Sequence, residues 1–219
     1  TLRLIKNVKN IPSSEKIIAR FKKTGLKVIS SLVDITNFIT LDYCRPLHVF
    51  DYDKINGDIT VRHSVKGEKF VGLDSEEYEL DSGMIVICDE IGIISLAGIL
   101  GGERTGCDEN TKNVLLESAY FKPSSIISTG RKLNIQSDAR YRFERGIDPF
   151  SVIDGIQIAS EMILKICGGE VGNIISDSEK NEKPEKIKIE KFFFNEVLGI
   201  EVSIDFVKDK LEKIGCTLK

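Results

Sequence analysis

The middle of the chain contains a series of short apolar runs separated by glycine, aspartate and serine, and this spacing limits the fold more than any other feature. Each run is too short for an ordinary helix and carries the β-branched and aliphatic residues typical of strands. The residues between the runs are those that favour turns. We therefore expect a β-rich centre with mixed or antiparallel pairing. The runs are DITVRHS (58–64), EKFVGL (68–73), MIVICD (84–89), GIISLAGI (92–99) and NVLLES (113–118).

Helices are predicted on both sides of this centre. Residues 12–25 begin with serines that can cap a helix and end at a glycine. Residues 149–167 follow Asp148, a favourable N-cap, and their apolar side chains recur at spacings of four and three. Residues 31–41 are apolar and β-branched, so the pattern leaves helix and strand open. The fold class predicted is α+β, with helices flanking the sheet.

Composition divides the chain into a large domain at 1–177, a charged linker at 178–186 and the start of a second unit at 187–219. The linker has almost nothing to bury. The second unit is too short for a full core of its own. Its expected elements are a strand at IKIEK (187–191), a short helix at FNEVLG (194–199) and an amphipathic helix at 203–215.

Composition also limits which binding partners and which cellular environment can be expected. The net charge of −3 gives no overall positive field, so any RNA contact must come from a local basic patch. No apolar run reaches the roughly 18 residues of a membrane helix, and no signal peptide is evident. Five cysteines without a CxxC pair favour free thiols in a reducing cytoplasm, and only two histidines accompany them, so no zinc site is expected. Because the first residue is Thr1, we expect a piece of a longer polypeptide.

A few positions could carry chemistry. His48 lies among apolar residues, so it is either a satisfied structural histidine or a site group that positions water or binds a ribose hydroxyl. Gly101 and Gly102 form either a tight turn or a place where backbone N–H groups approach a ligand. Glu117 shares one strand face with Leu115, and is either a carboxylate at the solvent edge or a pocket acceptor for one donor. His63, in contrast, is expected at the surface.

The densest basic cluster of the chain lies at 131–145. If this part of the chain is extended, Arg140 and Arg142 lie on one side and Ala139 lies with two aromatic residues on the other. Together with Arg145, these arginines form either a solvated face with ion pairs or a set of phosphate contacts.

Five segments follow one another in an order and at a spacing that resemble those of one protein family. They are VDITNFITLDYCRPLHVFD (33–51), LAGILGGERTG (96–106), NVLLESAYFKP (113–123), RKLNIQSDARYRFERGIDP (131–149) and ICGGEVG (166–172). The family is the beta subunit of bacterial phenylalanyl-tRNA synthetase, and the resemblance covers its editing module over residues 1–177. It implies a mixed or antiparallel β-rich editing domain. It also implies that residues 187–219 begin a small winged-helix-like domain.

The editing module of that family hydrolyses tyrosine wrongly attached to the phenylalanine tRNA. The site residues that the resemblance implies are the catalytic His48, Gly101 and Ser137 and the substrate-binding Glu117 and Ala139. The glycine pair adds Gly102 to the substrate-binding set, and the basic cluster gives Arg140, Arg142 and Arg145 as the expected tRNA-binding residues. Glu117 would recognise the tyrosine hydroxyl, and Ala139 would keep the pocket open. An apolar pocket built for phenylalanine rejects an added hydroxyl poorly, so a second site that selects for the hydroxyl is needed.

The resemblance also implies partners. These are tRNA(Phe) and a catalytic alpha subunit in an assembly of two alpha and two beta subunits, while neither a membrane nor DNA is expected. No cofactor or metal is expected in this chain, and ATP and magnesium act in the parent enzyme, whose synthetic site lies elsewhere. The alternative is a module of the same subunit that supports structure or binds tRNA without editing. One departure from the family is Cys44-Arg45, where Gly-Gln is common.

Overall fold

The structure is a computed structural model that describes residues 1–177, 186–190 and 192–218. The chain separates into two compact units, Thr1–Glu179 and Lys180–Lys219. Most of the expected linker at 178–186 lies outside the described residues. No helix in the described part of the chain is long and apolar enough to cross a bilayer.

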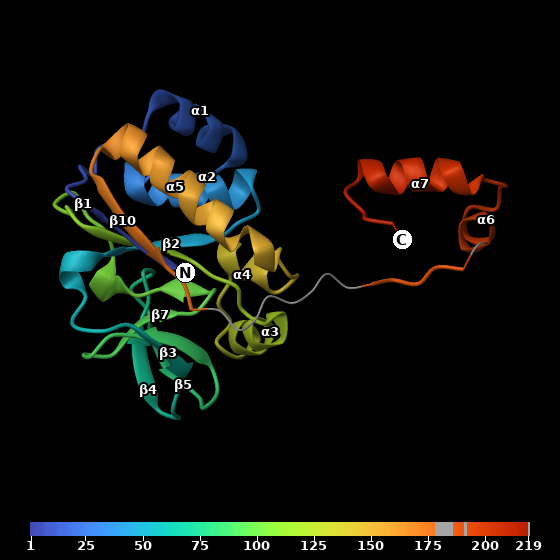
Figure 1. The fold of residues 1–219 in the computed structure, drawn as a ribbon. Coiled ribbons are helices and arrows are strands. Elements are labelled where there is room, and N and C mark those ends of the chain that lie inside the picture. The colour runs from blue at the N-terminus through green and yellow to red at the C-terminus, as the bar shows by residue number, and fades with distance from the viewer. Residues whose placement is uncertain (178–185, 191, 219) are drawn as a thin grey trace. The chain divides into compact units, whose positions relative to one another are not determined.

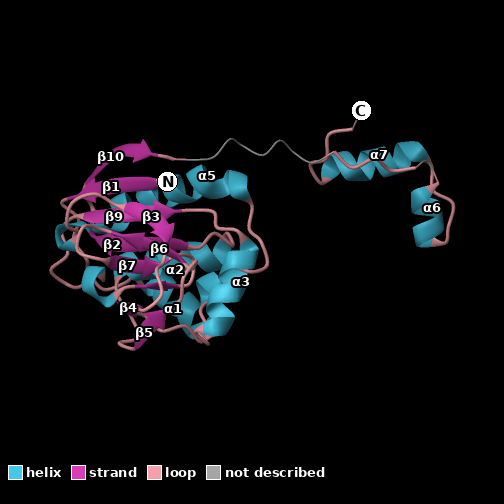
Figure 2. Ribbon diagram, turned by 90° about the horizontal axis from the view of Figure 1, so that it is seen from below, coloured by secondary structure: helices cyan, strands magenta, loops and turns pink. Residues whose placement is uncertain are grey.

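A four-stranded antiparallel sheet forms the middle layer of the first unit. Its strands follow the order β10 (Glu170–Ile175), β1 (Leu2–Lys6), β9 (Val114–Ser118) and β2 (Leu47–Asp51), as Figure 2 shows. Three helices cover one face of this sheet (Figure 1): α1 (Glu15–Thr24), α2 (Ser31–Asp42) and α5 (Val152–Cys167). Strand β2 is therefore an edge strand with α2 packed against it.

A smaller β-structure lies against the other face. It contains the antiparallel sheet β3 (Thr60–His63), β6 (Ile85–Cys88), β7 (Ile93–Leu96) and β8 (Leu100–Gly101), and the hairpin β4 (Glu68–Val71) and β5 (Glu77–Leu80). The helices α3 (Pro123–Lys132) and α4 (Asp138–Phe143) complete this core. Short 3-10 turns occur at Tyr52–Lys54, Glu103–Thr105 and Pro149–Ser151.

Strand β9 joins the two cores because its side chains alternate. Val114 and Leu116 pack beneath the helices, whereas Leu115 packs against the smaller β-structure. The predicted alternation is thus confirmed, and each of the five predicted runs contains a strand. Both predicted helices are also present in the first unit. The α+β class with antiparallel sheets and flanking helices is confirmed.

The ambiguous segment 31–41 forms helix α2. Its apolar residues Leu32, Ile35 and Ile39 recur at helical spacing and are fully buried in the core beneath the helices. Packing of the helix against the sheet therefore outweighs the local preference of its β-branched residues for a strand.

Two segments considered as extended chain are not extended in the structure. Residues 138–143 form α4 rather than an extended segment, because the Ser137 hydroxyl accepts a hydrogen bond from the Arg140 N–H at 3.0 Å and caps the helix. The described residues 187–190 form no strand. In the second unit, the predicted helices are present as α6 (Phe193–Leu198) and α7 (Ile204–Lys213). The winged-helix-like character of this unit stays a prediction.

A buried carboxylate ties the smaller β-structure together. Asp89 accepts two hydrogen bonds from the Arg104 guanidinium, at 2.9 and 2.7 Å. It also accepts from the backbone N–H groups of Asn56, Ile91 and Gly92. Burial by itself would raise the pKa of Asp89, but Arg104 and these N–H groups hold that pKa well below its usual range.

Candidate functional site

A cavity of about 490 Å³ lies where strand β2, the β7–β8 hairpin, α2 and α4 meet. Its wall is largely apolar, with a few polar groups, as is usual for small-molecule sites. Five of the residues predicted for the site line it together: His48, Gly101, Glu117, Ser137 and Ala139. These positions are spread over about 90 residues of sequence, and the antiparallel pairing of β2 with β9 accounts for much of their convergence.

His48 and Glu117 are direct cross-strand partners in that pairing. Directly opposed side chains project from the same face of a sheet with Cβ atoms about 5 Å apart. Glu117 is only 8% exposed. The Nε2 atom of His48 is enclosed and has no hydrogen-bond partner among the described residues. Because nearly all buried polar atoms in proteins have a partner, this pair indicates a place for a bound water or ligand.

Burial sets the protonation of both groups. It lowers the pKa of the His48 imidazole to about 4. It raises the pKa of the Glu117 carboxyl to about 7, against a smaller opposite effect of the nearby Thr1 amino group. Near neutral pH the imidazole is therefore uncharged and free to act as a hydrogen-bond acceptor or donor, while the carboxyl is close to its midpoint.

Gly101 provides the space that the imidazole occupies. A Cβ atom at Gly101 would lie 2.3 Å from His48 Cε1 and 2.7 Å from Nε2. The missing side chain thus admits the histidine ring, in addition to the expected approach of ligand to backbone. Gly102 lies outside the cavity wall, and its N–H donates to the Ile94 carbonyl at 2.8 Å. The Gly102 N–H is therefore already used within the sheet, and a substrate-binding role of Gly102 stays a prediction.

Ser137 and Ala139 reach the cavity from the start of α4. The Ser137 hydroxyl donates to the Ile99 carbonyl at 2.6 Å and accepts from the Arg140 N–H. One lone pair remains on this oxygen, so Ser137 can accept one more hydrogen bond but has no proton left to donate. Ala139 lies in the wall near Phe143, where a larger side chain would fill the space.

The three arginines predicted to contact tRNA do not share one surface. Arg140 is 6% exposed, and its guanidinium donates to the carbonyls of Gly130 and Ile135 and pairs with Glu144. The expectation that Arg140 faces outward beside Arg142 is therefore wrong, because Arg140 is turned into the α3–α4 junction.

The other two arginines keep accessible surface. Arg142 is half-buried and pairs with Asp138 at 2.9 Å. Arg145 is exposed and stacks over the Tyr141 ring at 3.7 Å. Contacts of Arg142 and Arg145 with RNA stay predictions. His63 is exposed, as predicted.

Helix α2 contributes cavity residues that sequence reasoning missed. Val33, Asn37 and Thr40 line the wall at helical spacing, and Cys107 lies in the same wall. Burial raises the pKa of the Cys107 thiol to about 12, so it is an uncharged wall group. The spacing of the α2 residues was visible in the sequence, but it has meaning only if 31–41 is helical.

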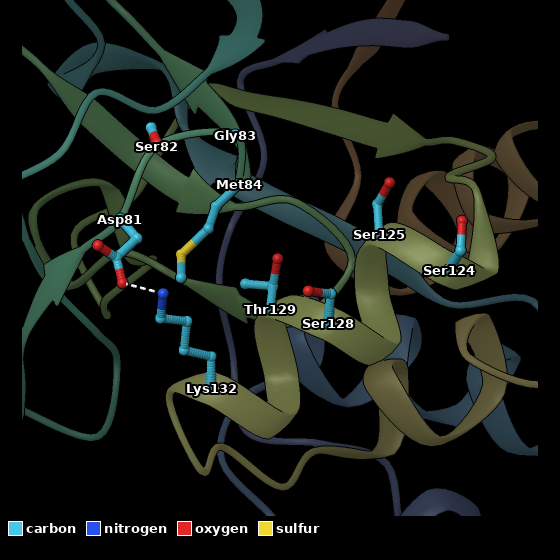
Figure 3. A pocket seen from close by; sticks show the side chains of 9 residues that line it. All are labelled: Asp81, Ser82, Gly83, Met84, Ser124, Ser125, Ser128, Thr129 and Lys132. Carbon is cyan, nitrogen blue, oxygen red and sulfur yellow. Dashed lines mark ion pairs between the residues drawn. The ribbon is translucent and has the colours of Figure 1, made fainter.

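A second, smaller hollow of about 290 Å³ lies between the β5–β6 turn and α3 (Figure 3). Hydroxyl groups of Ser124, Ser125 and Ser128 line it, and Asp81 forms an ion pair with Lys132 across it. These two charges neutralise each other. None of the predicted site residues lies in this hollow.

Within the described residues no group of three or more His, Cys, Asp or Glu side chains is placed to hold a metal ion. The five cysteines are free thiols. The polar groups of the cavity wall include the His48 imidazole, the carboxyls of Glu117 and Asp138, and hydroxyl, amide and thiol groups, among them the Ser137 hydroxyl.

Comparison with known proteins identifies this arrangement. The family model of the B3/4 domain matches residues 1–168. The chain belongs to the B3/4 domain family. The resemblance to phenylalanyl-tRNA synthetase beta subunits is confirmed by relatives named phenylalanine–tRNA ligase beta subunit.

Two relatives illustrate the extent of the similarity. The phenylalanine–tRNA ligase beta subunit of Brucella abortus (strain 2308) is 47% identical over 219 residues, which cover 98% of this chain and 27% of that protein. The corresponding subunit of Paramagnetospirillum magneticum is 47% identical over 216 residues, covering 99% of this chain and 27% of that protein. The chain thus spans about a quarter of the length of these relatives.

Among solved structures, this B3/4 chain is similar to an N-terminal fragment of the phenylalanyl-tRNA synthetase beta subunit from Pyrococcus horikoshii. The TM-score is 0.48 and the sequence identity 16%, over 97% of this chain and 59% of that chain.

The raised pKa of Glu117 predicts a pH-dependent stability of the B3/4 domain. A carboxyl with a raised folded-state pKa adds no penalty below its ordinary pKa of 4.5; stability is lost as the pH rises from 4.5 to about 7, and the full loss persists above that. The rise corresponds to about 3 kcal/mol at full ionisation. We expect Glu117→Gln to remove this loss, so that the variant is more stable than the wild type at about pH 8 but similar near pH 4. Denaturant unfolding of this chain at both pH values measures the difference.

The matched control is Glu79→Gln, which changes an exposed glutamate on β5. Its free energy of unfolding should follow that of the wild type at both pH values. Equal stability of Glu117→Gln and wild type at the higher pH would contradict the burial of an ionisable carboxyl at this position.

Proposed function

We propose that this B3/4 domain hydrolyses the ester bond of tyrosine mischarged on tRNA(Phe), as the editing module of a phenylalanine–tRNA ligase. The observation that carries the proposal is the enclosed Nε2 atom of His48, unpaired among the described residues, beside the buried carboxyl of Glu117 in a mainly apolar cavity. Such a cavity can accept an aromatic side chain. His48 and Glu117 can then hydrogen-bond a polar group at the end of that side chain.

Specificity follows from the buried carboxyl. The phenol hydroxyl of tyrosine can donate a hydrogen bond to Glu117, or accept one from its protonated form. Phenylalanine in the same place leaves Glu117 unpaired, which costs roughly 1–3 kcal/mol. This discrimination adds to that of a synthetic pocket, since an apolar pocket alone rejects an added hydroxyl only about a hundredfold.

The chemical step is the attack of water on an already activated ester. Water adds to the carbonyl carbon, the bond from that carbon to the ribose oxygen breaks, and the water proton ends on that oxygen. The uncharged imidazole of His48 orients water or passes its proton. Ser137 accepts one hydrogen bond from water or substrate, and backbone N–H groups around Gly101 stabilise the developing oxyanion.

The partners of this activity are tRNA(Phe) and a catalytic alpha subunit in an assembly of two alpha and two beta subunits. The similarity to beta subunits over nearly the whole chain supports this part of the proposal. Arg145 and Arg142 remain on the surface near α4 as candidates for phosphate contacts.

The test uses the complete synthetase and tyrosylated tRNA(Phe). We expect Glu117→Ala to slow release of tyrosine by roughly 10- to 100-fold, the equivalent of about 1–3 kcal/mol. Glu79→Ala, which removes an exposed strand glutamate, should leave the rate unchanged. Phenylalanine charging serves as the control for intact enzyme.

Tyrosine release by Glu117→Ala at the wild-type rate would remove Glu117 from recognition. If the wild-type enzyme itself released no tyrosine, the alternative function would hold. In that case the domain would support the structure of the subunit or bind tRNA without editing.

A further inference from the structure

Arg45 is the largest fully enclosed side chain of the domain, with 2% of its surface exposed. It lies between α2 and β2, three residues before His48. Removing a charged guanidinium from water costs several kcal/mol unless its donors are satisfied. Burial lowers the pKa of Arg45, and the charge of Asp148 partly opposes this. An arginine in this position therefore needs hydrogen-bond acceptors that compensate for the loss of its hydration.

The partners come from two other segments of the chain. Arg45 Nη1 donates to the Ala119 carbonyl at 3.0 Å, and Nε donates to the Ser151 hydroxyl at 3.0 Å. Nη2 donates to the Asp148 carbonyl and to the Ser151 hydroxyl. The oxygens that accept are thus two backbone carbonyls and one hydroxyl, so the guanidinium joins segments rather than a single counter-ion.

Helix α5 is shaped to admit this side chain. A Cβ atom at Gly155 would lie 2.6 Å from Arg45 Cγ and 3.2 Å from Cδ. Glycine lowers helix stability relative to alanine, so its presence inside α5 indicates a packing requirement. The requirement here is the aliphatic stem of Arg45.

The hydrogen bonds of Arg45 lie next to the strand ends that carry His48 and Glu117. Leu47 pairs with Ser118, and His48 pairs with Glu117, at the end of the β2–β9 ladder. The bond from Arg45 to Ala119 extends this connection beyond the last strand pair. Because β2 is an edge strand, no strand of the described structure pairs with its other side to hold it in place.

We propose that Arg45 is a positioning residue that fixes the start of β2 against the end of β9, and thereby holds His48 and Glu117 in the alignment that discriminates tyrosine from phenylalanine. The inference rests on the proposed editing function. Arg45 is not among the residues that line the cavity, so it acts through the two strand ends and the Asp148–Ser151 segment that it joins.

The test compares Arg45→Met and Arg45→Lys in the complete synthetase. Methionine keeps apolar volume but removes every donor, and lysine keeps the charge but cannot reach three acceptors at once. The measured quantity is the ratio of hydrolysis rates for tyrosylated and phenylalanylated tRNA(Phe). We expect Arg45→Met to reduce this ratio at least tenfold, since a misplacement of about 1 Å can cost on the order of a hundredfold. Arg45→Lys should recover part of the loss.

Arg20→Met is the matched control, because Arg20 has a side chain that is 61% exposed on α1. The pH at which tyrosine release is half-maximal should also shift in Arg45→Met and not in the control, since displacement of β2 changes the surroundings of Glu117. A merely structural role of Arg45 would lower the yield of folded enzyme without changing the ratio or this pH.

If Arg45→Met does not fold, Ser151→Ala decides, because it removes one partner and leaves both carbonyls in place. A reduced ratio in that variant supports the proposal. An unchanged ratio in a folded Arg45→Met enzyme, or in Ser151→Ala where the first variant fails to fold, overturns it. Absence of tyrosine release by the wild type would instead overturn the editing function itself, so the two failures are distinguishable.

Discussion

Replacing Gly101 with alanine is expected to reduce hydrolysis of tyrosylated tRNA(Phe) by roughly a hundredfold or more, the scale of a displacement of about 1 Å in a reacting group. The new methyl group would lie 2.3 Å from His48 Cε1 and 3.0 Å from a Leu73 methyl group. The half-exposed Leu73 side chain can move aside, but the imidazole has little room because its Nε2 atom is enclosed. The ring must therefore rotate or shift away from Glu117.

Hydrolysis by the complete synthetase measures this loss, and phenylalanine charging should persist. The control is Gly92→Ala, in which the added Cβ meets nothing within 4 Å. Equal activity of the two alanine variants would show that His48 does not depend on the space at Gly101.

The largest effect on stability is expected for Asp89→Ala. Breaking a buried ion pair by removing one partner costs about 3–5 kcal/mol, because the remaining charge is left uncompensated. Here the loss also leaves three backbone N–H groups, those of Asn56, Ile91 and Gly92, without their acceptor. The Asp89 side chain is fully enclosed, whereas that of Arg104 is 35% exposed, so water can restore part of the arginine's hydration.

Chemical denaturation of this chain checks the value, with Glu90→Ala as the neighbouring exposed control. Since the pKa of Asp89 is lowered in the folded state, its contribution should be present above the pKa of the unfolded chain and lost as the pH falls below it. A variant as stable as Glu90→Ala at neutral pH would contradict the anchoring role of Asp89.

Local patterns of the sequence predicted much of the fold. The alternation of Val114, Leu115 and Leu116 placed strand β9 between two apolar layers, and the structure has it there. Helix α2 was left ambiguous because β-branched residues weaken helix propensity, and only the sheet beneath it decides the outcome. The residues 187–190 alternate in polarity without forming a strand in the described structure, since alternation alone provides no partner strand.

The convergence of the site residues could not be predicted from local sequence patterns. The grouping of His48, Gly101, Glu117, Ser137 and Ala139 came from family resemblance rather than from spacing. Their actual meeting depends on strand register, which no local pattern displays.

Buried arginines were the main error of sequence reasoning. Arg140 is predicted at the surface and Arg45 is a departure from the family pattern, yet both are buried: Arg140 donates to the nearby carbonyls of Gly130 and Ile135, and Arg45 donates to the distant carbonyls of Ala119 and Asp148. Cys44 adopts a φ of 51°, a left-handed conformation that favours glycine, which gives a physical reason for the glycine common at this position in the family.

The pairing of His48 with Glu117 ties recognition to the integrity of the whole sheet. A slip of β2 by a single residue would turn the imidazole to the helical side of the layer, so partial misalignment offers no intermediate degree of selectivity. The proposed proofreading should therefore vanish in one step during heating, together with protection of the β9 amide hydrogens against exchange, rather than fade gradually as expected for a site on a loop.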